Sequence, residues 1–224
     1  MRELLSINNL SKKYMKKEIL TDISLSADCG QCYALVGENG AGKSTFIKCL
    51  LGFDKKYEGK IVINTQKIGY VPECIELPFN IELYDYLFIR GKIERYESDY
   101  LIQIIKEAIE YWGLNEYQRV KIGNLSKGNR QKVSIIQSYL FEQRLIVLDE
   151  PETGLDPYGQ EILRKLILKL RSEGRLIIFS SHSLDSVKRI ATNVVIFKNH
   201  HLIADIDVGN LETEDRTIEQ YYFE

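Results

Sequence analysis

Apolar residues along this chain follow patterns that together predict an α/β fold. Residues 33–36, 145–148 and 176–179 are short runs of consecutive apolar residues. Such runs predict strands buried on both faces, as in a parallel sheet with helices on either side. Over 46–51 and 162–170 the apolar residues instead recur at helical spacing. Strands that alternate with helices in this way predict a core built around a mostly parallel sheet.

The N-terminal part of the chain shows a weaker, alternating pattern. Residues 4–10 and 19–27 partly alternate apolar with polar side chains, which is typical of strands that expose one face. We therefore expect an antiparallel β subdomain beside the parallel sheet. A basic turn is expected between the two strands, over 11–17. A further pair of short strands is expected at 59–64 and 67–71, around Asn64-Thr65, and two more short strands are expected at 194–198 and 201–206.

The middle third of the chain is helical in pattern. Ser98 is a predicted N-cap, and the helix after it has one apolar face and ends at Gly113. Another helix is expected to run to about Phe141. We expect one domain over residues 1–224, with a core and its antiparallel β subdomain over 1–73 and 142–224, and an inserted helical subdomain over 74–141.

The composition indicates a globular protein and argues against a nucleic-acid-binding or membrane-spanning one. The chain has 224 residues, of which 44% are hydrophobic and 28% charged, and its net charge is −2. These values are ordinary for a globular domain and lack the basic excess of a nucleic-acid-binding protein. No apolar run approaches the roughly 20 residues that span a bilayer, and the first residues lack a secretory signal. We expect a cytoplasmic protein that does not insert into the membrane and reaches it through a partner.

The cysteines raise one metal or redox alternative. Cys29 and Cys32 have C-x-x-C spacing. A tetrahedral zinc site needs two further ligands, and no second pair or nearby histidine supplies them. We expect these thiols to be reduced and to pack in the fold, together with Cys49 and Cys74.

The segment Gly37–Thr45 fits the phosphate-binding pattern G-x-x-x-x-G-K-[ST]. A predicted strand precedes it and a predicted helix follows, which is the context that the pattern needs. Its glycines allow backbone N–H groups to surround an anion, and the helix start adds a positive dipole end. Lys43 is expected on the terminal phosphates and Ser44 on Mg²⁺. The alternative is a glycine-rich turn without a ligand. The predicted nucleotide-binding residues are Gly37, Glu38, Asn39, Gly40, Ala41, Gly42, Lys43, Ser44 and Thr45.

Polar residues follow the other two buried strands. Asp149 and Glu150 come after 145–148, and His182 follows 176–179. Ligands of parallel sheets bind at the carboxyl ends of the strands, so these side chains are expected beside the phosphate loop. Asp149 is a candidate Mg²⁺ ligand, and Glu150 is a candidate general base for an attacking water. The alternatives are an acidic turn for the two carboxylates and a structural role for the histidine.

The order of these motifs resembles the nucleotide-binding subunit of the ATP-binding cassette (ABC) transporter family. Leu125–Gln131 is similar to that family's signature L-S-G-G-Q, and Ile68–Pro72 is similar to the approach to its Q-loop. Gly154–Asp156 resembles the D-loop. The resemblance makes Tyr14 the adenine-stacking aromatic and His182 the switch histidine. From the residues alone, Tyr14 is equally well read as a side chain that closes the hairpin end.

The resemblance implies ATP and Mg²⁺ as cofactors and two chains in each active unit. A helix start at Ser126 and Gly128 forms a second anion site, which in this family closes over the ATP of a partner subunit. Asn129 stands where the last signature glutamine would be. Glu73 replaces the Q-loop glutamine and is expected, with Ser44 and Asp149, near the metal.

The expected function is that of an ATPase subunit which powers a transporter with separate transmembrane subunits. The chain is expected at the inner face of the cell membrane, bound to an integral membrane subunit and to a second nucleotide-binding subunit. Its compact form and Glu73 resemble the cassettes of drug or peptide exporters. The alternatives are a soluble ABC-type ATPase, such as a cofactor-assembly factor, and a nucleotide sensor that never hydrolyses.

Overall fold

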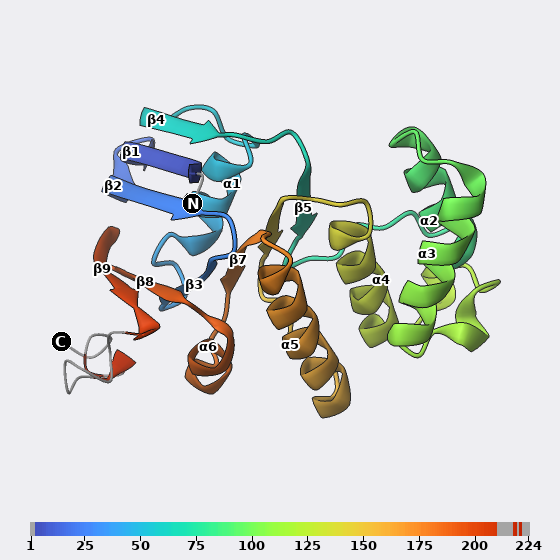
Figure 1. The fold of residues 1–224 in the computed structure, drawn as a ribbon. Coiled ribbons are helices and arrows are strands. Elements are labelled where there is room, and N and C mark those ends of the chain that lie inside the picture. Colours follow the sequence, from blue (N-terminus) through green and yellow to red (C-terminus); the bar gives the residue numbers. More distant parts are fainter. Residues whose placement is uncertain (1–2, 210–216, 219, 221–224) are drawn as a thin grey trace.

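A nine-stranded sheet runs through the part of the chain that the computed structural model describes, residues 3–209, 217–218 and 220 (Figure 1). Its strands lie in the order β4-β1-β2-β9-β8-β3-β7-β6-β5. The strands are β1 (Glu3–Tyr14), β2 (Lys17–Asp28), β3 (Cys32–Gly37), β4 (Glu58–Ile63), β5 (Ile68–Val71), β6 (Leu145–Leu148), β7 (Leu176–Ser180), β8 (Asn193–Lys198) and β9 (His201–Asp207). The helices are α1 (Lys43–Leu50), α2 (Leu83–Ile93), α3 (Ser98–Tyr111), α4 (Lys127–Tyr139), α5 (Pro157–Ser172) and α6 (Leu184–Ile190).

The sheet has a parallel part and an antiparallel part, as expected. Strand β3 pairs in parallel with β8 and β7, β7 with β6, and β6 with β5. Strand β1 pairs antiparallel with β2 and β4. Strand β9 joins the two parts, because it is antiparallel to β8 and meets β2 at Thr21 and His201. Figure 1 shows the antiparallel strands and the α2–α3 helices at opposite ends of the molecule.

Two details of the antiparallel part differ from the expectation. β1 continues to Tyr14 and β2 begins at Lys17, so most of the expected basic turn is strand. Lys12 within it is only 2% exposed, and its Nζ lies 2.7 Å from Asp54 Oδ1. A buried lysine with a carboxylate partner occupies an inward-facing strand position that the sequence marks as polar. Strands β4 and β5 do not pair with each other, since they form the two edges of the sheet.

The sheet separates two apolar cores, and successive residues of a strand point into different ones. Leu145 and Val147 of β6 pack with α1 and the antiparallel strands, whereas Ile146 and Leu148 pack on the side of α4 and α5. This division follows from the two-residue period of a strand. Continuous apolar runs in the sequence are therefore explained by helices that cover both faces.

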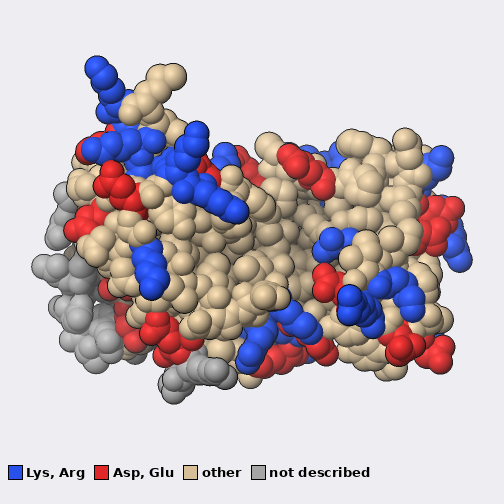
Figure 2. All heavy atoms as spheres, turned by 90° about the horizontal axis from the view of Figure 1, so that it is seen from above, with Lys and Arg blue, Asp and Glu red and all other residues tan. Residues whose placement is uncertain are grey.

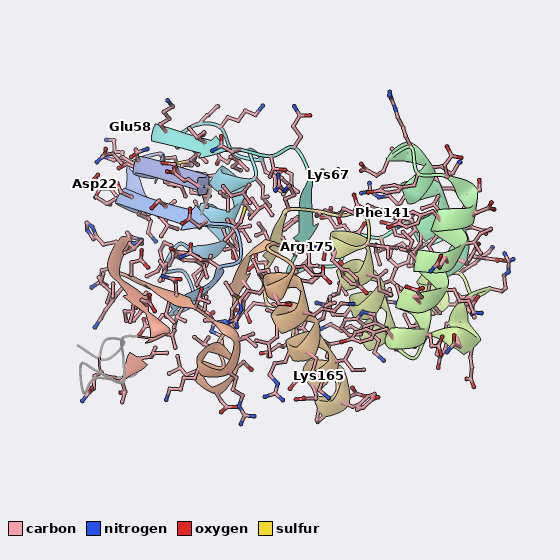
Figure 3. All side chains as sticks on the ribbon, in the orientation of Figure 1. Asp22, Glu58, Lys67, Phe141, Lys165 and Arg175 are labelled. Atoms are coloured by element: carbon pink, nitrogen blue, oxygen red, sulfur yellow. The ribbon has the colours of Figure 1, made fainter. Side chains whose placement is uncertain are left out.

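The helical segment is confirmed, with one correction at its start. Glu97 precedes α3 and makes no side-chain cap, and Ser98 is already the first helical residue. The Ser98 hydroxyl instead accepts a hydrogen bond from Lys92 Nζ at 3.2 Å. Trp112, at the end of α3, is fully buried. Phe141, labelled after α4 in Figure 3, lies 5.9 Å from the Tyr96 ring between centroids.

Close contact between β5 and α4 fixes the signature helix against the sheet. A Cβ atom at Gly69 of β5 would lie 1.8 Å from the backbone oxygen of Ser138 in α4. Gly69→Ala is therefore expected to lower the free energy of unfolding by about 3 kcal/mol, measured by urea denaturation. The exposed neighbour Gln66 supplies the control, because Gln66→Ala is expected to change stability by less than about 0.5 kcal/mol. Equal stability of the two variants would contradict this packing.

Candidate nucleotide-binding site

Three parallel strands end at one edge of the sheet and bring the predicted motifs together. β3 ends at Gly37, β6 at Leu148 and β7 at Ser180, and each is followed by polar residues. A cavity of about 380 Å³ opens at this edge. Its lining residues are Lys17, Ile19, Glu38, Asn39, Gly40, Gly42, Lys43, Ser44, Thr45, Glu73, Asp149, Glu150 and His182.

The phosphate loop has the backbone that its glycines predict. Gly40 and Gly42 have φ angles of 83° and 111°, in the region that side chains rarely adopt. A Cβ atom at Gly42 would also lie 2.8 Å from the backbone oxygen of Ile19. Helix α1 begins directly after Gly42, and no side chain caps its start. Its first amide groups therefore remain available to an anion in the cavity.

Lys43 is a buried cation held without a carboxylate bond. It is 7% exposed, and its Nζ donates to the backbone oxygens of Gly37 at 2.6 Å and Glu38 at 3.2 Å. Burial lowers the pKa of Lys43, and the nearby carboxylates of Glu150 and Asp149 oppose that shift. A buried ammonium group that touches only carbonyls suits a site for the negative charge of a nucleotide phosphate.

Asp149 is fixed from two sides at the end of β6. It is 4% exposed, its N–H donates to the oxygen of Val71 at 2.8 Å, and its Oδ1 accepts from Ser180 Oγ at 2.7 Å. The next residue, Glu150, has a φ angle of 49°. Its N–H donates to the same Ser180 hydroxyl at 2.8 Å.

The Glu150 carboxylate is half-buried and only partly paired. Burial raises its pKa, and the neighbouring His182 and Lys43 oppose the rise. Oε1 lies 3.1 Å from His182 Nε2. That oxygen is nevertheless buried without an aligned hydrogen bond to any described residue. Oε1 therefore has the His182 imidazole as its neighbour but no aligned hydrogen bond, and a carboxylate oxygen in that state beside a phosphate site is suited to accept a hydrogen bond from water.

The predicted metal ligands Ser44, Asp149 and Glu73 all line the same cavity. Among the described residues no three His, Cys, Asp or Glu side chains gather into a preformed metal site. Mg²⁺ does not require such a cage, because it commonly binds one or two carboxylates together with substrate phosphates. The donor set therefore fits a magnesium–nucleotide complex, in which the ion would lower the charge repulsion around the reacting phosphate.

Among the residues predicted for this chain's own ATP, Gly37 and Ala41 do not line the cavity, and neither does Tyr14. Its hydroxyl donates to Asp54 Oδ2 at 3.0 Å, and Lys12 Nζ lies 4.6 Å from the ring centroid. The ring is 44% exposed, so one side stays open to solvent. Lys17 and Ile19 line the cavity instead, at alternate positions of β2. Alternate residues of a strand point to the same side, and this period was the sequence signal that Lys17 and Ile19 share one face of β2.

The signature residues also lie outside this chain's own cavity. Ser126 caps α4, and its hydroxyl accepts from the N–H of Asn129 at 3.1 Å. A Cβ atom at Gly128 would lie 2.8 Å from the oxygen of Gly154, so the helix start packs closely on the segment after Glu150. This second helix start therefore lies away from the chain's own cavity, with Ser126 exposed.

Two serines at the end of β7, Ser180 and Ser181, were missed by the sequence reasoning. Ser180 holds Asp149 and Glu150 as described, and Ser181 Oγ donates to Glu152 at 3.3 Å. The other oxygen of Glu152 accepts from Ser186 Oγ at 2.7 Å. Polar residues at the end of a fully buried strand were the available signal, because such groups need hydrogen-bond partners.

Comparison with known proteins identifies the family. The family model described as "ABC transporter" matches residues 20–153. The chain belongs to the ABC transporter family. An uncharacterized ABC transporter ATP-binding protein of Methanocaldococcus jannaschii is 35% identical over 202 residues, which cover 88% of this chain and 75% of that protein. The lantibiotic transport ATP-binding protein SrtF of Streptococcus pyogenes is 33% identical over 196 residues, 84% of each chain.

A solved structure of an ATP-binding subunit of an ABC transporter has the same fold. It superimposes with a TM-score of 0.91 at 26% sequence identity and covers 98% of both chains. The expected P-loop core, with its mixed sheet, is thereby confirmed for this ABC ATP-binding subunit. None of its described helices combines the length and the apolar character needed to cross a bilayer.

Proposed function

We propose that this ABC subunit hydrolyses ATP with Mg²⁺ and drives an export transporter with separate membrane subunits. The observation that carries the proposal is the arrangement at the strand ends. A buried Lys43 ammonium group, the fixed Asp149 carboxylate and a Glu150 oxygen without a hydrogen bond share one cavity. Lys43 and Asp149 would suffice for binding a magnesium nucleotide. A partly desolvated Glu150 carboxylate beside them is suited, in addition, to activate water.

Each residue has a role that follows from its surroundings. The first amides of α1 and the Lys43 ammonium hold the phosphates. Ser44, Asp149 and Glu73 hold Mg²⁺, which supplies charge neutralisation when bound. Glu150 Oε1 orients the attacking water and takes its proton, and His182 stands beside that carboxylate with its Nε2 at 3.1 Å.

The active unit in this proposal contains two nucleotide-binding subunits. Ser126, Gly128 and Asn129 form a helix start that does not line this chain's cavity. Backbone N–H groups and the dipole at that start suit a phosphate supplied by another chain. We therefore assign these three residues to the ATP of the partner subunit, and Tyr14 to the base of the chain's own ATP.

A membrane subunit is the second proposed partner. A groove of about 710 Å³ adjoins the nucleotide cavity and shares Ser44, Glu73 and Asp149 with it. Its other walls are Lys48, Phe53, Tyr70, Pro72, Cys74, Glu76 and Gln137. Figure 2 shows that the middle of the face seen from above is mostly uncharged, while basic side chains gather over the antiparallel strands. A partner bound in this groove would contact residues that we assign to the metal.

The proposed route of coupling is through the helical subdomain, residues 74–141. It contains both the groove residue Cys74 and the signature helix start at Ser126. Export is favoured by the similarity to a lantibiotic transport protein and by Glu73 at the Q-loop position. In this arrangement the subunit sits at the inner face of the cell membrane without inserting into it.

Purification from membranes tests the transport proposal. The tagged chain, extracted in detergent, is expected to bring down a multi-span membrane protein and to hydrolyse ATP only with Mg²⁺. An ATPase that stays in the soluble fraction without any membrane protein would contradict the transport role and favour a soluble cassette. Absence of hydrolysis in the presence of the membrane subunit would favour a nucleotide sensor.

A further inference from the structure

A single buried hydroxyl holds Asp149 and Glu150, two of the carboxylate-bearing residues of the site. Ser180, the last residue of β7, is 0% exposed. Its Oγ donates to Asp149 Oδ1 at 2.7 Å and accepts the N–H of Glu150 at 2.8 Å. A serine hydroxyl has one proton and two lone pairs, so one group serves both neighbours at once. Among the described residues, no other side chain forms a hydrogen bond to Asp149 Oδ1 or to the Glu150 N–H.

The backbone at Glu150 explains why such a support is needed. Its φ angle of 49° lies in the left-handed region, which non-glycine residues seldom occupy. Such a conformation persists only where the surroundings hold it. The hydrogen bond from the Glu150 N–H to Ser180 acts on the residue that carries the strain. It therefore determines where the Glu150 side chain leaves the backbone.

Ser180 itself has little freedom to move. Strand β7 lies between β3 and β6 in the middle of the parallel sheet, and Ser180 is opposite Leu35 of β3. Asp149 is held from the other side, because its N–H donates to Val71 of β5. The hydroxyl thus connects the end of a rigid central strand to the turn that follows β6.

We propose that Ser180 is a positioning residue that orients Asp149 for Mg²⁺ and Glu150 for the attacking water. The inference rests on the proposed hydrolytic function of this site. The hydrogen bond to Asp149 Oδ1 leaves Oδ2 for the cation and restricts rotation of the carboxylate. The bond to the Glu150 N–H stabilises the turn from which the general base projects.

The test compares Ser180→Ala with Ser134→Ala. Ser134 is also buried, but its hydroxyl has no hydrogen-bond partner among the described residues, so its removal controls for the loss of a buried oxygen. ATP binding is measured with EDTA and then across a Mg²⁺ titration. Ser180→Ala is expected to keep Mg²⁺-free ATP affinity within about twofold. The Mg²⁺ concentration that gives the half-maximal change in its ATP binding is expected to rise roughly tenfold, and its kcat is expected to fall at least tenfold.

The outcomes separate this inference from the proposed function. A Ser180→Ala protein with the Mg²⁺ requirement and kcat of Ser134→Ala would overturn the positioning role. Lack of hydrolysis by the unchanged protein would instead contradict the proposed function, while the Mg²⁺ titration of ATP binding still tests Ser180. Should Ser180→Ala not fold, Ser180→Cys gives the same comparison. It keeps the volume, and its weak S–H donor is expected to shift the Mg²⁺ requirement in the same direction.

Discussion

Glu150→Gln is expected to bind ATP with nearly unchanged affinity and to lose at least 100-fold in kcat. Glutamine keeps the size of the side chain and removes the group that accepts a proton, and general-base catalysis commonly contributes about 10²–10⁴-fold. The oxygen concerned is buried, lacks an aligned hydrogen bond among the described residues and shares a cavity with Lys43. Phosphate release and equilibrium ATP binding, measured on the same preparation, check both halves of the prediction.

Glu152→Gln is the matched control for that variant. Glu152 lies two residues further along the same turn, and its carboxylate bonds to Ser181 and Ser186 rather than lining the cavity. We expect the Glu152→Gln variant to keep kcat within about tenfold, because a glutamine amide can still form hydrogen bonds with both serine hydroxyls. Comparable turnover in the Glu150→Gln variant and the unchanged protein would remove Glu150 from the role of base.

Lys43→Ala is expected to weaken ATP binding on the order of 100-fold. A hydrogen bond to a charged group contributes about 1.5–3 kcal/mol, and every 1.4 kcal/mol is a factor of ten in affinity. Lys43 Nζ donates to the backbone carbonyls of Gly37 and Glu38 and to no carboxylate of the described residues. Its removal therefore does not break a salt bridge. The fold is therefore expected to survive, which circular dichroism checks beside calorimetric titration with ATP.

Lys48→Ala provides the comparison on the same helix. Lys48 lies one turn beyond Lys43, is exposed and does not line the nucleotide cavity. It is expected to leave ATP affinity within about threefold, because exposed charges interact weakly through water. If the two lysine variants bound ATP equally well, the assignment of the phosphate loop would be wrong.

The parts of the fold that the sequence predicts are those with a strong local pattern. The strands around Val36, Val147 and Ile178 are continuously apolar because helices cover both faces of the sheet. Asp156 followed by Pro157 is a sequence signal for a helix start, and Asp156 does cap α5, with the Gly159 N–H donating to Asp156 Oδ1 at 2.7 Å. Each of these signals acts within a few residues, so no tertiary contact is needed to read it.

The remaining features depend on partners that are distant in the sequence. The sequence around Lys12 predicts a solvated turn, whereas in the fold Lys12 is buried and bonds to Asp54, 42 residues later in the chain. Tyr14 is turned toward the same Asp54, which no local pattern reveals. Ser180 likewise reaches Asp149, 31 residues earlier in the chain, only because β6 and β7 are neighbours in the sheet. Tertiary pairing therefore decides which polar residues of a strand or turn become buried.

The same limit applies to the site itself. The phosphate loop, Asp149, Glu150 and His182 were predicted because each follows a strand that the apolar pattern identifies, and one cavity contains residues from all three segments. Lys17 and Ile19 enter that cavity only because β2 passes beside Gly42. Ser126 and Gly128 do not line this cavity, and for that reason we proposed for them the ATP of another molecule.

The central proposition is that a second chain's signature segment closes over Mg²⁺–ATP, and the mass of the hydrolysis-blocked protein tests it most directly. Light scattering on Glu150→Gln with ATP and Mg²⁺ is expected to give twice the 26.0 kDa of one chain, and 26.0 kDa without nucleotide. Ser126→Arg in the same background is expected to stay monomeric, because a large side chain would block the helix start. A strictly monomeric Glu150→Gln protein with ATP bound, even in the presence of its membrane subunit, would contradict the proposition.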